Sequence, residues 1–176
     1  MIKIAITGPE STGKSKLAEG LAAVYKTAFV PEFAREYLED IGRPYDIHDV
    51  VEIARQQLKL EAEAANLHPD ILFCDTELTV CKIWCEVKFG YCPVEISQWA
   101  EAVDYDLYLL CDIDLPWEYD PLREHPHLRE HLFSSYLSEI EKKIVPFGIV
   151  SGTGPRRIAN ARALLNRYFP DFIHPA

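Results

Sequence analysis

The sequence predicts an α/β fold in which helices cover both faces of a parallel sheet. Five short apolar runs alternate with longer amphipathic runs along the 176 residues, and strands separated by helices pair in parallel. A Gly-rich segment, Gly8–Ser15, lies between the first strand and the first helix, and a second apolar run, Ile71–Asp75, ends in a carboxylate. The length corresponds to a single domain over residues 1–176.

The predicted strands are the short apolar runs. Ile2–Thr7 stops at Gly8, and Asp70–Asp75 is apolar at nearly every position, which is typical of a strand buried on both faces. The remaining predicted strands are Thr27–Val30, Tyr105–Cys111 and Phe147–Val150.

The predicted helices follow the 3.6-residue period, beginning with Ser15–Tyr25. A long helix through Leu67 is expected to have Asp49 as its N-cap. Its apolar face is interrupted by two polar residues, Gln57 and Glu61. The other predicted helices are Glu32–Ile41, Leu78–Lys88, Val94–Val103, Leu128–Lys143 and Arg156–Tyr168.

Charge and hydropathy exclude several classes of function. Against 28 acidic residues there are 18 Lys and Arg, a net charge of -10, so we expect no nucleic-acid partner and no anionic membrane surface. No run approaches the roughly 20 apolar residues that span a bilayer, and the opening strand is too short for a secretory signal. The five cysteines follow no zinc-ribbon spacing, and free cysteines most often behave as small buried hydrophobes. We therefore expect a reduced cytoplasmic protein; a homo-oligomer is left open.

The segment Gly8–Ser15 reads GPESTGKS and fits the pattern G-x-x-x-x-G-K-[ST] at every fixed position. Such a loop points backbone N–H groups at phosphate oxygens, and the following helix adds its N-terminal partial charge. Lys14 is expected to reach the β- and γ-phosphates of ATP, and Ser15 to bind Mg²⁺. The alternative is a Gly-rich turn without a ligand. The expected ATP-binding residues are Gly8, Glu10, Ser11, Thr12, Gly13, Lys14 and Ser15.

Asp75 ends a buried strand, where open α/β sheets form their ligand crevice. We expect it to hold Mg²⁺, directly or through water. The alternative is a cap for the helix that begins near Glu77.

The chain lacks the N-K-x-D segment of GTPases and is too short for a mechanical ATPase, which favours a small-molecule kinase. Glu32, after the second strand, is placed to accept a proton from a substrate hydroxyl. Phe33 and Tyr37 share a helix face and could stack on a flat ring, and Arg35 could orient a hydroxyl or a phosphate. The alternatives are core packing for both aromatics and a helix-start acid for Glu32.

A charged loop with Pro116, Pro121 and Pro126 is the expected lid, over about residues 115–130. Arg123 and Arg129 can converge from the loop and the following helix start to neutralise the transferred phosphoryl group. The alternative is solvated surface charge.

Four segments together resemble ribosylnicotinamide kinase, the kinase domain of NadR-type NAD-biosynthesis proteins, which is similar to deoxynucleoside kinases. They are GPESTGKS, PEFAREY at Pro31–Tyr37, Asp75-Thr76-Glu77, and DLPWEYDPLR at Asp114–Arg123. The likeness runs nearly end to end.

The resemblance implies a P-loop fold with strand order 2-3-1-4-5 and transfer of the ATP γ-phosphate to the 5′-hydroxyl of nicotinamide riboside. It implies that Lys14 and Ser15 bind phosphate and Mg²⁺. It implies that Glu32 stands where related nucleoside kinases have their catalytic base, and that Asp75 holds Mg²⁺ or activates the acceptor hydroxyl. The lid would supply Arg123, Arg129 and the substrate contacts Trp117 and Asp120.

The chain departs from the family at Pro31, where a Trp is common, and we expect neither the adenylyltransferase nor the DNA-binding domain of NadR proteins. The aromatics left to replace that Trp are Phe33, Tyr37, Trp84, Trp99 and Trp117. Two alternatives follow: a kinase for another nucleoside or small polyol, and an ATP- or GTP-binding regulatory module with little transfer activity.

Overall fold

The computed structural model describes residues 1–171 and contains a five-stranded parallel sheet in the order β2-β3-β1-β4-β5. This confirms the predicted fold class and strand order. The strands are β1 (Ile2–Thr7), β2 (Phe29–Val30), β3 (Ile71–Asp75), β4 (Leu107–Cys111) and β5 (Phe147–Val150).

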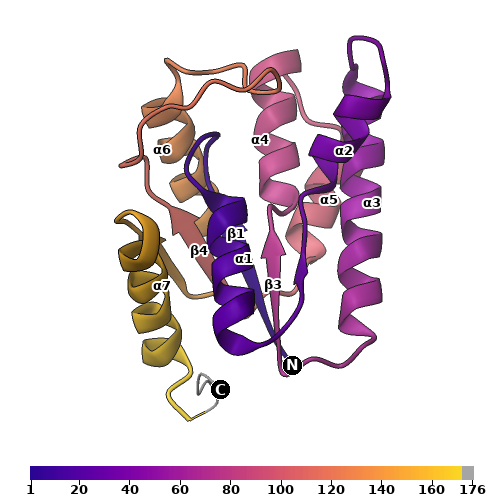
Figure 1. Cartoon of the computed structure of the whole chain (residues 1–176). Coiled ribbons are helices and arrows are strands. Elements are labelled where there is room, and N and C mark those ends of the chain that lie inside the picture. Colours follow the sequence, from indigo (N-terminus) through magenta and orange to yellow (C-terminus); the bar gives the residue numbers. More distant parts are fainter. Residues whose placement is uncertain (172–176) are drawn as a thin grey trace.

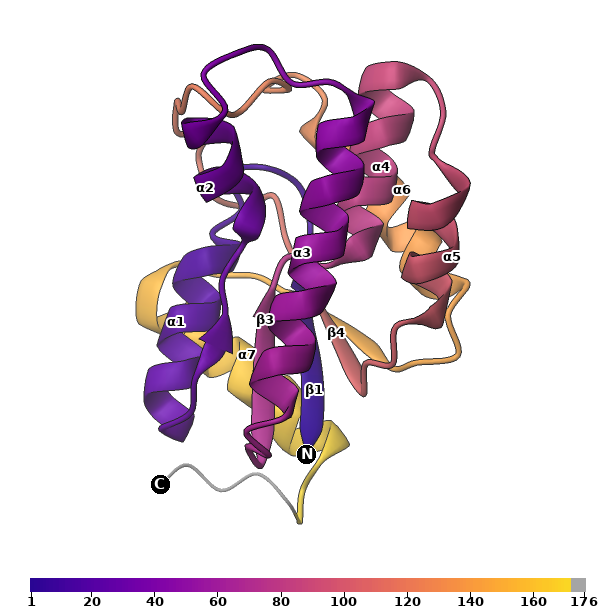
Figure 2. The same cartoon turned by 90° about the vertical axis from the view of Figure 1, so that its right-hand side faces the viewer.

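Helices cover both faces of the sheet, as Figures 1 and 2 show. On one face, α1 (Lys14–Tyr25) and α7 (Gly154–Tyr168) pack on the side chains of Ile4, Ile6 and Leu109. On the other, α3 (Ile47–Ala65), α4 (Leu78–Phe89) and α6 (Arg129–Glu141) pack on those of Leu72, Cys74 and Leu110. Alternate residues of each strand thus serve opposite cores, which explains why the strands are apolar throughout.

A third apolar cluster joins the helices to one another. It lies between α2 (Phe33–Asp40), α3, α4 and α5 (Val94–Ala102). Cys81 and Cys85 are buried in it and have free thiols. No helix within residues 1–171 is long and apolar enough to cross a membrane.

The carboxyl ends of β1, β3 and β4 meet at one edge of the sheet. There the loop before α1 lies beneath the segment between β4 and α6, which has neither helix nor strand (Figure 1). This segment corresponds to the predicted lid, and its position over the strand ends forms the crevice expected of an open parallel sheet.

The start of α3 corrects one sequence prediction. The N-cap is Asp46, whose carboxylate accepts hydrogen bonds from the backbone N–H groups of His48 (2.8 Å) and Asp49 (3.3 Å). Asp49 is the third helical residue, and its carboxylate accepts from the Asp46 N–H at 2.7 Å. The prediction was wrong because either acid of this reciprocal capping box looks like an N-cap in the sequence.

Candidate active site

The loop from Gly8 to Gly13 joins β1 to α1 with a backbone that needs its glycines. Gly8 has φ +130°, and a Cβ atom there would lie 3.0 Å from the Cys111 carbonyl oxygen. Gly13 is the N-cap of α1 with φ +74°, in the left-handed region. Both conformations favour glycine, so the two fixed glycines of the motif stand where the backbone of the loop requires them.

Two polar side chains at the end of this loop donate hydrogen bonds to the loop's own backbone. The Lys14 ammonium donates to the carbonyl oxygens of Gly8 (2.9 Å) and Pro9 (3.0 Å). The buried Thr12 hydroxyl donates to the same Pro9 oxygen at 2.7 Å. The ammonium is therefore held over the loop, next to the N-terminus of α1, where an anionic phosphate is favoured.

Arg157 on α7 supports the loop from below. Its side chain is buried, and its guanidinium donates to the carbonyl oxygens of Thr12 (2.9 Å) and Asp112 (3.0 Å) and to the Asp114 carboxylate (2.7 Å). Four hydrogen bonds to three segments fix the loop against the ends of β4 and β5. No local pattern in the sequence indicates this contact, because the partners of Arg157 lie far away along the chain.

Asp75 ends β3 with an exposed fraction of 2%, and its Oδ1 atom has no hydrogen-bond partner among residues 1–171. Burial and the negative charge of Glu32 raise the pKa of this carboxyl to about 6, against the lowering effect of the Ser15 hydroxyl and the Lys14 ammonium. Unpaired buried carboxylate oxygens are costly. An oxygen of this kind beside a serine hydroxyl fits the hard oxygen ligands that Mg²⁺ prefers.

Glu77 fixes the position of Asp75 relative to the loop. Its buried carboxylate accepts from the Thr7 hydroxyl (2.9 Å) and caps α4 through the Thr79 N–H (2.7 Å). Complete burial raises the pKa of this carboxyl. Because Thr7 ends β1 and Glu77 follows β3, the bond joins the two strand ends; Glu77, rather than Asp75, is the helix cap.

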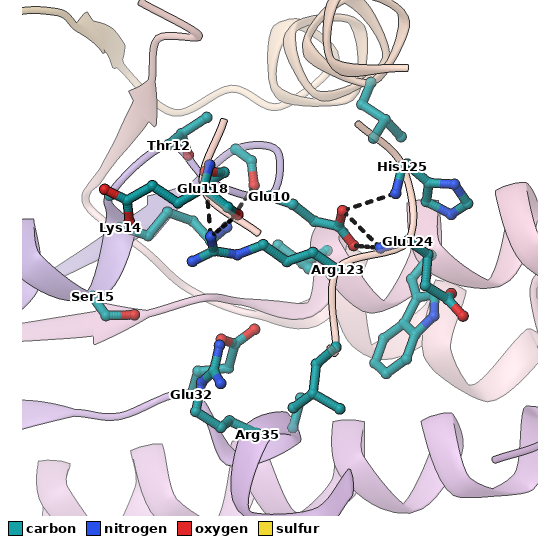
Figure 3. Close-up of a pocket in the computed structure, with 18 of the residues that line it drawn as sticks. Glu10, Thr12, Lys14, Ser15, Glu32, Arg35, Glu118, Arg123, Glu124 and His125 are labelled. Carbon is teal, nitrogen blue, oxygen red and sulfur yellow. Dashed lines mark hydrogen bonds between the residues drawn. The ribbon is translucent and has the colours of Figure 1, made fainter. Parts of the chain in front are cut away.

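Glu32 and Arg35 face the loop from the opposite wall of the crevice, which Figure 3 shows together with Lys14, Ser15 and Arg123. Glu32 is the N-cap residue of α2, yet its side chain makes no capping hydrogen bond. The Arg35 guanidinium donates to the Asp120 carboxylate at 2.9 Å, which raises the pKa of Arg35. Asp120 thereby links the lid to α2.

The two lid arginines both reach Ser11. Arg123 donates to its hydroxyl at 3.3 Å, and Arg129 donates to its carbonyl oxygen at 3.2 Å and to Leu115 at 2.8 Å. Burial lowers the pKa of the Arg129 guanidinium. The structure thus brings Arg123 from the lid and Arg129 from the start of α6 to the loop between β1 and α1.

Glu10 connects the loop to the lid from the other direction. Its carboxylate accepts hydrogen bonds from the backbone N–H groups of Glu124 and His125, each at 3.2 Å (Figure 3). The lid is therefore closed over the loop by main-chain donors, and its position is coupled to a residue of the GPESTGKS segment.

The crevice encloses a cavity of about 530 Å³, large enough for small ligands. The sequence-predicted residues that line it are Gly8, Glu10, Ser11, Thr12, Gly13, Lys14, Ser15, Glu32, Arg35 and Arg123. Those that do not line it are Phe33, Tyr37, Asp75, Trp117, Asp120 and Arg129.

Phe33 and Tyr37, for which both substrate stacking and core packing were open, lie outside the cavity. Their rings pack on each other (centroids 5.9 Å apart) and on the cluster between α2, α3 and α4. The Tyr37 hydroxyl donates to Asp49 at 2.8 Å. The apolar face of α2 on which they lie is the face that packs on α3, so the packing alternative holds for both. Trp99 packs in the same cluster.

The aromatic wall of the cavity comes from Trp84 on α4 and Tyr45 before α3. The Trp84 Nε1–H donates to the Tyr45 hydroxyl (2.9 Å), which donates to the Glu124 carboxylate of the lid (2.6 Å). Tyr45 was not predicted. The signal that could have found this wall is a second apolar stripe on α4, where Val80, Trp84 and Val87 recur at helical spacing.

Comparison with known proteins places the chain in a family. The sequence model of an AAA domain family matches residues 3–157. The chain belongs to this family. Over 127 residues, the chain is 26% identical to the trifunctional NAD biosynthesis/regulator protein NadR of Salmonella typhimurium and 27% identical to that of Escherichia coli. Each alignment covers 68% of this chain and 30% of the relative.

Solved structures share the AAA domain's fold. A NadR protein in complex with NR superposes with a TM-score of 0.74 at 20% identity, over 99% of this chain and 52% of that one. Deoxyadenosine kinase from M. mycoides gives 0.68 at 16% identity, over 94% of this chain and 100% of that one. The chain therefore spans about half of the NadR structure and less of the curated relatives. The resemblance drawn from the sequence motifs is confirmed, as is the fold of P-loop kinases.

Proposed function

We propose that this AAA domain protein is a kinase that transfers the γ-phosphate of ATP to a nucleoside hydroxyl. The observation that carries the proposal is the arrangement across one cavity: Glu32 and Arg35 face Lys14 and Ser15 from the opposite wall. A phosphate-binding loop alone would suit a switch or a motor. A carboxylate free of capping bonds, set opposite the loop, suits activation of an acceptor hydroxyl.

In this mechanism the chain contributes mainly position and charge. The Glu32 carboxylate accepts the proton of the acceptor hydroxyl as its oxygen attacks the γ-phosphorus, and ADP leaves. Lys14, Arg123 and Arg129 neutralise charge on the phosphoryl oxygens, where the loose transition state spreads it. Because that transition state needs little base assistance, we expect the cations to contribute most.

Ser15 and Asp75 are the residues that would hold Mg²⁺. Their fit rests on the unpartnered Oδ1 atom of Asp75 and on the neighbouring Ser15 hydroxyl. When bound, the ion would neutralise negative charge on the phosphates.

For the acceptor we propose nicotinamide riboside, with its 5′-hydroxyl phosphorylated to the mononucleotide in the cytoplasm. The support is the likeness to NadR, one structure of which is in complex with NR, and the aromatic wall of Trp84 and Tyr45, which suits a flat ring. The runner-up is another nucleoside, supported by the likeness to deoxyadenosine kinase.

A coupled assay of ADP release with a panel of acceptors tests the proposal. We expect Mg²⁺- and ATP-dependent release with nicotinamide riboside above that with deoxyadenosine, deoxycytidine and ribose. Lys14→Ala should nearly abolish release, and Glu32→Gln should lower kcat by about 10- to 100-fold with little change in the KM for ATP.

Three results would redirect the assignment. Release with another nucleoside alone would retain the kinase and change its substrate. Tight ATP binding without acceptor-dependent release would favour a regulatory module. Wild-type kcat in both Glu32→Gln and Asp75→Asn would contradict the roles given to these carboxylates.

A further inference from the structure

Two polar side chains, Gln57 and Glu61, interrupt the apolar face of α3, and both are nearly inaccessible, with exposed fractions of 2% and 1%. Glu61 forms an ion pair with Lys3 at 2.7 Å and accepts from the Tyr105 hydroxyl at 2.8 Å. These partners lie at the amino ends of the strands, away from the cavity. Glu61 is thus a satisfied structural group, whereas Gln57 has a different set of partners.

Gln57 contacts the backbone on both sides of Glu32. Its Oε1 atom accepts from the Phe33 N–H at 3.0 Å, and its Nε2 atom donates to the Pro31 carbonyl oxygen at 3.3 Å. An amide is the side-chain group that offers an acceptor and a donor side by side. It therefore holds the Pro31–Phe33 backbone at two points, with Glu32 between them.

This contact bears on the direction of the Glu32 side chain. N-cap side chains ordinarily accept from the unpaired N–H groups of the first helical turn, and Glu32 makes no such bond. Gln57 supplies an acceptor for the first of these donors, that of Phe33. The Glu32 backbone stays extended at φ -68° and ψ 111°, and its side chain lines the cavity.

We propose that Gln57 is a positioning residue that holds the Glu32 carboxylate toward the acceptor by fixing the backbone before α2. This inference rests on the proposed kinase function and deepens it. It accounts for a buried amide on a mainly apolar helix face, which core packing alone would disfavour.

The sharpest test is a double-mutant cycle of Gln57→Leu with Glu32→Gln, measured as kcat with the acceptor that supports turnover. If Gln57 acts through Glu32, Gln57→Leu lowers kcat by about tenfold with the KM for ATP nearly unchanged. The double variant should then be no slower than Glu32→Gln alone. Multiplied losses in the double variant, or wild-type kcat in Gln57→Leu, would overturn the proposal.

Gln57→Glu provides a second, near-isosteric test that does not depend on tolerance of an apolar side chain. When protonated, the introduced carboxyl can accept from the Phe33 N–H and donate to the Pro31 oxygen; when ionised, it loses the donor. The kcat of Gln57→Glu relative to wild type should therefore fall by about tenfold from about pH 5.5 to about pH 8.5. A ratio independent of pH would contradict the proposal.

Neighbouring charges enter the interpretation of this profile. The titratable groups around Gln57 are Glu32 before α2 and Cys81 on α4, which line the same small cavity. Asp75 lies close enough to Glu32 for their charges to interact. All three are also present in the wild type, so the ratio of the two kcat values isolates the introduced carboxyl.

Glu61→Gln is the matched control, because it alters a buried polar residue one turn along the same helix face. It should lower stability and leave the kcat and its pH profile near those of the wild type. The two proposals also fail in different ways. A wild type without acceptor-dependent release refutes the kinase function, whereas an active wild type with unaffected Gln57 variants refutes only the positioning role.

Discussion

Asp75 lies 2% exposed at the end of β3, with one carboxylate oxygen unpaired and a pKa raised to about 6 by burial and by Glu32. In an unfolded chain an aspartate titrates near 3.9. The folded state therefore binds this proton more tightly than the unfolded state, and stability falls as pH rises from about 4 to about 6. An ionised Asp75 costs the metal-free fold on the order of 3 kcal/mol.

We predict that Asp75→Asn removes this cost. In EDTA near pH 7.5, the variant should have a free energy of unfolding higher by up to about 3 kcal/mol, and the difference should vanish below about pH 4. Urea titrations across pH measure it. Kinase turnover should be lost in the same variant, because the amide is a poor ligand for Mg²⁺. Equal stability of the two proteins at neutral pH would contradict the electrostatic argument.

At the scale of elements, the lid between β4 and α6 has no regular structure of its own and depends on contacts to several other segments. Glu10 accepts two of its backbone N–H groups, Arg35 binds Asp120, and Tyr45 binds Glu124. Segments held by few exposed contacts open at low free energy. The lid's closed position therefore depends on side chains outside it.

We predict that Glu10→Gln loosens the lid without disturbing the sheet. The neutral amide offers one acceptor oxygen where the carboxylate offers two, so a main-chain bond to Glu124 or His125 weakens. Amide hydrogen exchange should become about 3- to 10-fold faster in residues 118–125, with unchanged protection in β1 and β4. The control is Glu118→Gln, a lid residue whose side chain makes no hydrogen bond or ion pair with the described part of the chain; faster exchange in that variant alone would contradict the assignment.

The whole molecule shows which features a sequence can predict. The positions of helices and strands and the loop Gly8–Gly13 follow from periodicity and from local backbone needs, such as those of Gly8 and Gly13. The strand order was implied by the resemblance to NadR-type kinase domains. The packing of Phe33 and Tyr37, the amide at Gln57 and the buried Arg157 depend on partners distant along the chain. Their roles could not be predicted, since a helix face shows its hydropathy but not its neighbour.

Arg157 provides the prediction at this scale. Arg157→Lys should lower the free energy of unfolding by about 2–4 kcal/mol, because a lysine cannot reproduce the planar fork that serves four acceptors and would leave buried groups unpaired. Urea denaturation measures the change. Arg156→Lys is the matched control, since the neighbouring side chain is exposed; equal effects of the two substitutions would contradict the argument.

The bond from Arg157 to the Thr12 carbonyl oxygen spans 145 positions of the chain. During synthesis the loop therefore emerges long before α7, the helix that supports it. In a ribosome-bound chain that ends before α7, this loop should therefore lack a fixed conformation and have little affinity for nucleotide. Nucleotide binding then becomes available only once α7 has been made, and a bound nucleotide would favour chains that carry α7 over shorter nascent ones.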